Sequence, residues 1–287
     1  MKAGRPEKLI EATVPRKRAR MALPPQETGW RRLDAPSVAA ILFLIFVITA
    51  FPLLKGSGRP LDTWGNLTRF VGGFLPPDLT IWQPTLAALW ETLQMAALAT
   101  FFGVTFSILF SALAARSLSP GWVVVPIRLT LNAIRTIPSL IWALIAVAVV
   151  GANPLAGVVG LTFYSIGYLG KFFSEAFESV DLEAAKGLRA IGASRFQTFQ
   201  YGLWPTARPI IWSYSLWMFE YNIRSASIVG YVGAGGLGLQ LLRYQEFNQW
   251  ERFATVLLCI FLVVTLLDFI SGRLRRRYVE RSQGAAS

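Results

Sequence analysis

The stretch "FATVLLCIFLVVTLLDFI", Phe253 to Ile270, is an unbroken apolar run that contains a single charged residue. A helix of roughly 17 to 25 such residues is long enough to cross the hydrocarbon core of a bilayer. Five similar runs lie at Val38–Leu54, within Leu86–Leu113, within Leu129–Val150, at about Leu155–Phe173 and at about Ile210–Val229. Helices satisfy their own backbone hydrogen bonds in lipid, so the six runs predict an all-α bundle of about six transmembrane spans.

The composition agrees with a membrane protein. Hydrophobic residues make up 54% of the 287 residues, charged residues make up 15%, and the mean hydropathy is +0.47, which is too apolar for a soluble domain. The alternating ten-residue pattern of a β-barrel does not occur. With one cysteine and no histidine, the chain cannot form an internal disulfide, and a His/Cys metal site is not expected.

The net charge of +12 comes from basic residues gathered outside the spans. Three basic segments stand out: the tail 1–35, the insert between the fourth and fifth spans, and the tail 273–287. Lys and Arg mark cytoplasmic loops, and six spans place all three segments on one side, so both termini are expected in the cytoplasm. This pattern favours contact with membrane lipid over nucleic acid. We therefore divide the chain into the tail 1–35, a first span with an extracytoplasmic loop (36–85), a transmembrane domain (86–272) and the tail 273–287.

The insert, at about 178–205, is predicted to hold two short helices. One helical face is formed by residues spaced by three, namely Leu182, Ala185, Leu188 and Ile191. Gly192 can end this helix, and Ser194 with Gln197 forms a capping box that starts a second one, expected to stop before Pro205. A helix-turn-helix DNA reader is excluded, because no residues remain for its third helix. An ordinary amphipathic connector stays open on spacing alone.

A family resemblance decides between these alternatives. The segment "EAAKGLRAIGASRFQTFQYGLWPTARP", Glu183 to Pro209, resembles the EAA signature of bacterial ABC importer permeases. In that family the segment is a coupling helix that docks on a cytoplasmic ATPase. The resemblance implies that the ATPase-coupling residues are Glu183, Ala184, Ala185, Gly187 and Gly192. A bulky residue in place of Gly192 is then expected to uncouple or disassemble the complex.

Two further segments narrow the family. "NAIRTIPSLIWALI" (Asn132–Ile145) and "FEYNIRSASIVGYVGAGGLGLQLL" (Phe219–Leu242) are similar to the permease of phosphonate ABC importers, which resembles the methionine-type class. The resemblance implies a homodimer in the bacterial inner membrane, two ATPase subunits that use ATP-Mg, and an extracytoplasmic substrate-binding protein. No cofactor is expected on this chain. The implied substrate is a phosphonate, with phosphite, hypophosphite or phosphate as alternatives.

Charged residues and glycines inside the spans are candidates for the substrate path. Glu220 and Arg224 are four residues apart, so they can pair on one helical face, or Arg224 can attract an anion. Gly233, Gly235 and Gly236 can form a nest of backbone N–H groups that binds an anion, or they can simply end a helix. Arg135 can belong to the path or anchor the inner face by snorkelling.

The residues support other function classes less well than transport. An enzyme needs a nucleophile with a base or a cluster of metal ligands, and the carboxylates of this chain are scattered. The sequence has no Walker A motif, so ATP hydrolysis is expected in a separate subunit. A channel or a receptor-like membrane protein with an adaptor-binding loop remains the alternative from another class.

Overall fold

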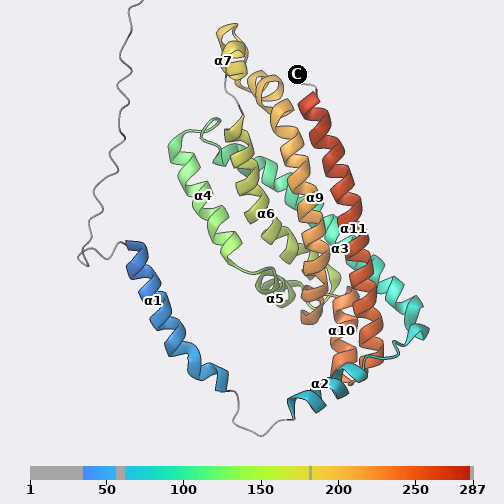
Figure 1. Cartoon of the computed structure of the whole chain (residues 1–287). Coiled ribbons are helices and arrows are strands. Elements are labelled where there is room, and N and C mark those ends of the chain that lie inside the picture. Colours follow the sequence, from blue (N-terminus) through green and yellow to red (C-terminus); the bar gives the residue numbers. More distant parts are fainter. Residues whose placement is uncertain (1–34, 56–61, 181–182, 285–287) are drawn as a thin grey trace, which may run out of the picture. The chain divides into compact units, whose positions relative to one another are not determined.

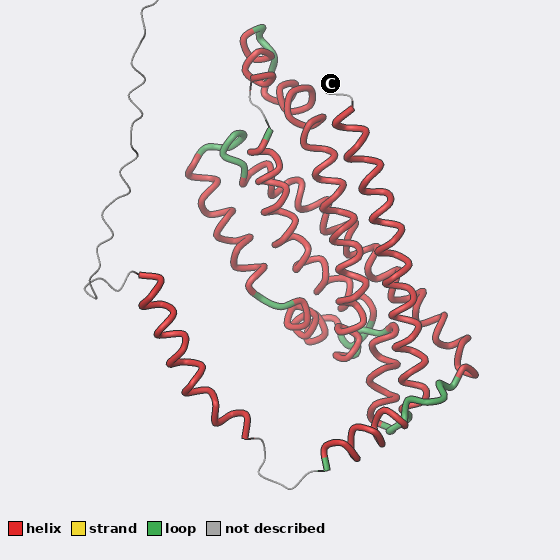
Figure 2. The backbone as a smooth tube through the Cα atoms, in the orientation of Figure 1, coloured by secondary structure: helices red, strands yellow, loops and turns green. Residues whose placement is uncertain are grey.

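The computed structural model describes residues 35–55, 62–180 and 183–284, and every regular element in these ranges is helical (Figures 1 and 2). The α-helices are α1 (Ala35–Ala50), α2 (Thr63–Gly72), α3 (Trp82–Ala114), α4 (Gly121–Thr136), α5 (Ser139–Val150), α6 (Pro154–Ser179), α7 (Glu183–Ala190), α8 (Arg195–Gln197), α9 (Trp204–Val229), α10 (Gly236–Glu246) and α11 (Trp250–Gly284). Short 3-10 turns lie at Phe51–Lys55, Leu79–Ile81 and Gly230–Val232, and a π-helical segment lies at Thr198–Leu203. The all-α prediction is confirmed.

The described residues fall into two compact units that divide between Asp62 and Thr63. In the first unit, α1 and the turn after it form one apolar helical stretch, Pro36–Leu54, that is long enough to cross a membrane. In the second unit, α3, α6 and α11 each reach this length alone. Two further spans are bent pairs, α4 with α5 at 89° and α9 with α10 at 46°. The described residues therefore hold four unbroken candidate spans, or six if each pair counts as one.

The third predicted span, Leu129–Val150, is not one continuous helix. The chain turns by 89° between Thr136 and Ser139, where Pro138 has no N–H to continue the helix. The indole Nε1–H of Trp142 donates to the carbonyl of Ile134 at 3.1 Å, which satisfies an acceptor exposed by the break. A proline at this position favours a bend, but its presence does not set the angle.

Helix α6 is the central helix of the second unit, and glycines allow its neighbours to approach closely. A Cβ at Gly103 of α3 would lie 2.6 Å from Cβ of Ser165, and one at Gly160 would lie 2.6 Å from the backbone nitrogen of Ala143. Asn222 of α9, fully buried, donates at 3.0 Å to the hydroxyls of both Ser165 and Thr100. Small residues and interhelical hydrogen bonds hold helices together in lipid, so this core fixes α3, α6 and α9.

The insert folds largely as predicted. Helix α7 ends at Ala190, Gly192 in the turn after it adopts φ +89°, and Ser194 and Gln197 exchange the two hydrogen bonds of a capping box at 2.8 and 3.2 Å. The predicted stop before Pro205 is wrong. The helix that starts at Arg195 continues through the π-helical segment into α9, because a proline in the first turn of a helix needs no N–H donor.

The predicted outer loop also contains structure that the hydropathy pattern did not reveal. Helix α2 is amphipathic, and around its C-terminal end the rings of Phe70, Phe74 and Trp250 pack at centroid distances of 5.0 to 5.8 Å. Nearby, the Thr80 hydroxyl and N–H, helped by the guanidinium of Arg252, hold the pKa of Asp78 below its usual range. These contacts join the start of α3 to the start of α11.

Candidate functional site

Helix α7 projects from the end of the second unit at which α11 also ends in Figure 1. Glu183, Gly187 and Gly192 are exposed, and a Cβ at either glycine would meet nothing within 4 Å. The side chain of Ala184 lies outside the described residues. The positive φ of Gly192, rather than close packing, is what favours glycine at that position. This surface is open to a partner.

Ala185 faces the opposite way. It is 6% exposed and belongs to the same apolar core as Phe177 of α6 and Leu203, which leads into α9. A Cβ at Gly202 would lie 3.3 Å from Cα of Ala185, so a small residue on the π-helical segment lets α7 pack closely. The structure thus gives Ala185 a packing role inside the chain. A force on α7 passes directly into the ends of α6 and α9.

Large exposed apolar side chains next to α7 were missed by the sequence analysis. Ile191 is 81% exposed, Phe196 is 71% exposed and Tyr201 is 66% exposed. The prediction emphasised small residues, and it placed Ile191 on the same helical face as Ala185. Exposed apolar groups at a polar end of a membrane protein indicate a protein contact. Their position on both sides of the Gly192 turn could have been noticed from the capping box.

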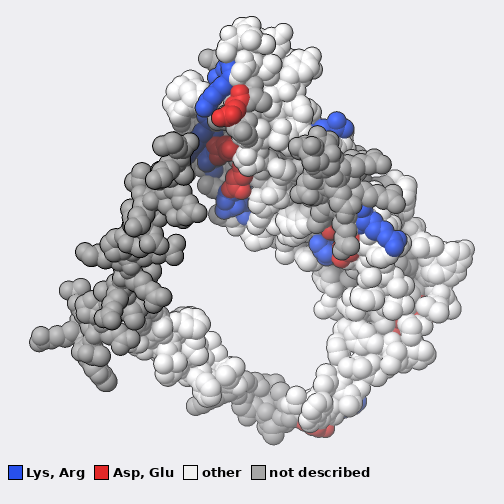
Figure 3. Space-filling model, turned by 45° about the horizontal axis from the view of Figure 1, so that its top comes forward, with Lys and Arg blue, Asp and Glu red and all other residues white. Residues whose placement is uncertain are grey.

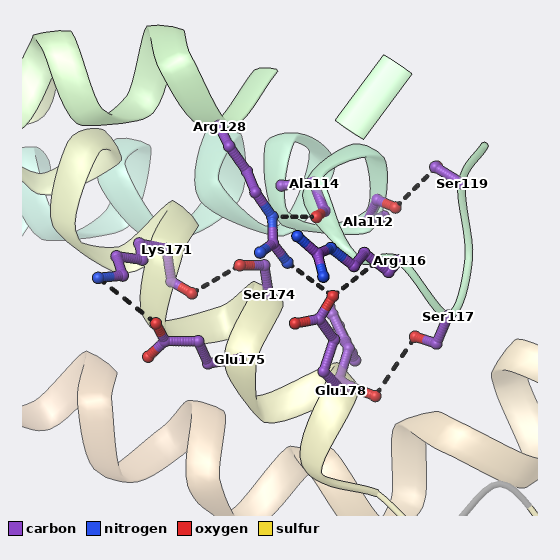
Figure 4. A network of polar contacts seen from close by, with 11 residues as sticks. Ala112, Ala114, Arg116, Ser117, Ser119, Arg128, Lys171, Ser174, Glu175 and Glu178 are labelled. Atoms are coloured by element: carbon purple, nitrogen blue, oxygen red, sulfur yellow. Dashed lines mark hydrogen bonds and ion pairs between the residues drawn. The ribbon is translucent and has the colours of Figure 1, made fainter. Parts of the chain in front are cut away.

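A polar network ties the end of α6 to the turn between α3 and α4 (Figure 4). Glu178 Oε1 accepts the backbone N–H of Arg116 at 2.7 Å and Nη2 of Arg128 at 2.6 Å. Arg128 also donates through Nε to the carbonyl of Ala114 at 2.9 Å. The network lies two residues before the chain leaves α6 toward α7. It therefore links the coupling segment to α3 and α4.

A pocket of about 390 Å³ lies beside this network, between α4 and α6. Its lining residues are Arg128, Leu131, Asn132, Arg135, Lys171, Ser174 and Glu175. Lys171 pairs with Glu175 at 3.5 Å, and both are partly exposed. Figure 3 shows acidic and basic side chains together in a column near α4 and α6, on a surface that is otherwise mostly uncharged. Such a pocket can hold a small anion.

An aromatic face continues from the pocket along α6 and α9. The ring of Tyr164 lies 4.6 Å from that of Tyr168 and stacks on Tyr221 at 5.1 Å. Farther along, Phe172 stacks on Tyr214 at 4.9 Å. All but Tyr164 are only half-buried, so this face is not a closed core.

At the predicted glycine nest, one backbone N–H binds a side chain of the same chain. Gly233, Gly235 and Gly236 all adopt positive φ. The N–H of Gly236, at the start of α10, donates to Oε2 of Glu91 at 3.1 Å. The next N–H, of Leu237, donates to the hydroxyl of Thr92. Helix packing between α3 and α10 thus accounts for the nest, and its anion is a carboxylate of α3.

Arg224 has an ionic partner that sequence spacing did not predict. Its Nη1 lies 3.6 Å from Oδ1 of Asp268 on α11, and both side chains are about half exposed. Glu220 lies one turn earlier on α9 and is half-buried. The attraction of substrate by Arg224 stays a prediction, although its charge now has a counter-charge. Within the described ranges, no cluster of three His, Cys, Asp or Glu residues could hold a metal ion.

Comparisons with known proteins agree with this arrangement. Residues 107–280 match the family described as binding-protein-dependent transport system inner membrane component. A phosphite transport system permease of Stutzerimonas stutzeri is 34% identical over 87% of this chain and 90% of its own length. A phosphate-import permease of Mycolicibacterium smegmatis is 32% identical over 81% of this chain and 44% of its own length. In fold, a chain of the MetNI methionine ABC transporter, in inward-facing conformations, matches 70% of this chain and 99% of its own length, with a TM-score of 0.62 and 22% identity.

Proposed function

The chain belongs to the family of binding-protein-dependent transport system inner membrane components, and from this premise we propose that it moves a phosphorus oxyanion across the membrane by alternating access. It is the permease subunit of an ABC importer, a multi-pass component of the inner membrane that performs no covalent chemistry. The substrate class we propose is phosphonate, phosphite or phosphate. The observation that carries this proposal is the likeness to a phosphite permease over 87% of the chain.

The local chemistry supports an anionic substrate. The pocket between α4 and α6 carries three cations against one lining carboxylate. Arginine binds tetrahedral oxyanions through two parallel hydrogen bonds, and lysine adds a point charge. An importer for a neutral or cationic solute would have no use for this excess of positive charge.

For coupling, we place the ATPase contact on the exposed side of α7 and the turn after it. Ile191 and Phe196 supply apolar anchors, and Glu183, Gly187 and Gly192 surround them at a polar rim. This end is then cytoplasmic, as are both termini. ATP-Mg binds to the ATPase and not to this chain. Closure of the ATPase moves α7, and the core around Ala185 carries the motion into α6 and α9.

We propose that two copies of the chain form the path. The pocket and the aromatic face of α6 and α9 remain partly exposed in a single copy. A second copy that faces them would enclose a polar path away from lipid, which lowers the cost of moving an anion across the bilayer. The substrate-binding protein would deliver substrate at the end opposite α7. ATP binding opens the path outward, and hydrolysis resets it.

Substrate identity is tested by competition. The permease is reconstituted with its ATPase, and the loaded binding protein is added outside vesicles that contain ATP. Uptake of radiolabelled phosphate is measured against excess methylphosphonate, phosphite, hypophosphite, sulfate or methionine. We expect at least one phosphorus oxyanion to be taken up or to compete, and sulfate and methionine to have no effect. Transport of another solute, with no competition by any phosphorus oxyanion, would refute the substrate assignment.

A further inference from the structure

One side of α6 carries a stripe of polar and aromatic residues that ends near the coupling segment. Tyr164, Tyr168, Lys171 and Glu175 follow at spacings of four, three and four, which places them on one face of the helix. Helix α4 borders the stripe with Arg135, whose backbone packs against Gly167. Helix α9 borders it with Tyr221. Three helices thus build one continuous surface.

Three phenols meet at one level of this stripe. Tyr164 contacts both Tyr168 and Tyr221, with ring centroids 4.6 and 5.1 Å apart. The guanidinium carbon of Arg135 lies 6.0 Å from the centre of the Tyr168 ring. Each phenol offers an O–H donor, and the guanidinium offers five N–H donors. Hydroxyl and guanidinium donors of this kind bind the oxygens of small tetrahedral anions in proteins.

Arg135 is the cation of this group whose charge is not compensated. Arg128 pairs with Glu178 at 2.6 Å, and Lys171 pairs with Glu175 at 3.5 Å. Among the residues that the structure describes, no carboxylate lies within ion-pair distance of Arg135. The three cations of the pocket thus stand against two carboxylates, those of Glu175 and Glu178. One positive charge, that of Arg135, remains.

The position of Arg135 along α4 decides whether its charge can reach the membrane surface by snorkelling. It lies in the last turn of α4, about 21 Å along the helix from Gly121 at 1.5 Å per residue. Snorkelling back over that distance is beyond the length of an arginine side chain. The residue also stands directly before the 89° break, and broken helices expose polar groups at the binding sites of transporters. A cation at such a depth is tolerated where it faces a wet path or meets an anion.

We propose that Arg135, together with the hydroxyl groups of Tyr164, Tyr168 and Tyr221, forms the station where a phosphorus oxyanion pauses on its way to the cytoplasm. This inference rests on the proposed function and names the residues of its path. Lys171 and the paired Arg128 continue the path toward the end that bears α7. Glu175 and Glu178 keep the net charge small, so the anion binds weakly enough to leave.

The test uses the full importer, with its ATPase and binding protein, in vesicles. Arg135→Gln removes the charge, and Arg135→Lys keeps the charge but loses the planar fork. Tyr168→Phe keeps the ring and removes one hydroxyl. Arg69→Gln is the control, because Arg69 is an exposed arginine of α2 whose guanidinium donates to Gly65 and Asn66 of its own helix. The readouts are the uptake rate and the ATP hydrolysis stimulated by the loaded binding protein.

We expect Arg135→Gln to lower uptake by about tenfold or more, as loss of a charge-assisted contact does, while at least half of the stimulated hydrolysis remains. Arg135→Lys and Tyr168→Phe should give intermediate uptake, and Arg69→Gln should stay within twofold of wild type. Uptake by Arg135→Gln within twofold of wild type would overturn the inference. If that variant fails to assemble, Arg135→Lys and Tyr168→Phe decide by the same criterion: both at wild-type uptake would overturn it. A wild-type importer that moves no phosphorus oxyanion would instead refute the proposed function.

Discussion

Removing the carboxylate of Glu178 tests the polar network that ties the end of α6 to the turn between α3 and α4. The same oxygen accepts hydrogen bonds from the Arg116 N–H at 2.7 Å and from Arg128 at 2.6 Å. Hydrogen bonds to charged groups contribute about 1.5–3 kcal/mol each. The side chains of Arg128 and Glu178 are 31% and 28% exposed, so solvent screening lowers this value. We expect Glu178→Ala to cost about 2 kcal/mol in total.

This cost can be measured as a melting temperature of the purified permease in detergent. A loss of about 2 kcal/mol lowers the Tm by roughly 4–8 °C in a chain of this size. The control is Glu175→Ala, because Glu175 is 53% exposed and pairs only within its own helix, at 3.5 Å. Such a pair contributes about 0.3–0.5 kcal/mol, so its Tm should fall by less than about 2 °C.

A double-mutant cycle measures the contribution of the Arg128–Glu178 ion pair apart from the other contacts of these two side chains. Arg128→Met and Glu178→Ala should together cost less than the sum of the two single changes, because they share one interaction. Glu178→Ala should also weaken the ATP hydrolysis that the loaded binding protein stimulates. Equal Tm values for the Glu178 and Glu175 variants, or additive effects in the cycle, would refute the argument.

Three further changes test other parts of the account. Gly238→Ala should abolish stable folding in a thermal melt, because its Cβ would lie 2.0 Å from the carbonyl of Ser227, whereas Gly121→Ala, with open space around it, should melt within about 2 °C of wild type. Asn222→Leu should lower the free energy of unfolding by about 1–3 kcal/mol, since it leaves the Thr100 and Ser165 hydroxyls without their buried partner; an unchanged Tm would contradict this. Phe196→Asp and Gly192→Leu should each reduce co-purification of the ATPase with an intact permease, and wild-type recovery of the ATPase with both variants would show that it docks elsewhere.

Much of the fold follows from hydropathy and charge. Long apolar runs predict spans, and basic segments predict their orientation, because both depend on local composition. Hydropathy alone does not give the 89° angle at Pro138, because that angle depends on packing of α5 against α6. At Pro205 the predicted end of a helix is wrong. A proline ends a helix or starts one, and only the neighbouring π-helical segment decided that it starts α9.

The site was harder to predict, because its members come from different helices. The coupling segment has a local signature, so its helices and cap could be found from sequence. The partner of Arg224 lies 44 residues away on α11, whereas helical spacing predicts only pairs that are three or four residues apart. Glu91 binds the nest at Gly236 over an even larger separation. Whether Arg135 can snorkel depends on where α4 begins and bends, and the sequence alone does not give these two points.

The central claim is that ATP hydrolysis drives this chain as an importer. The most direct measurement is uptake of the phosphorus oxyanion into vesicles that contain the permease and its ATPase, with the binding protein outside and ATP or no ATP inside. The account predicts accumulation against a gradient only when ATP, the ATPase and the binding protein are all present. Equal uptake without ATP or without the ATPase would identify a channel and contradict the account.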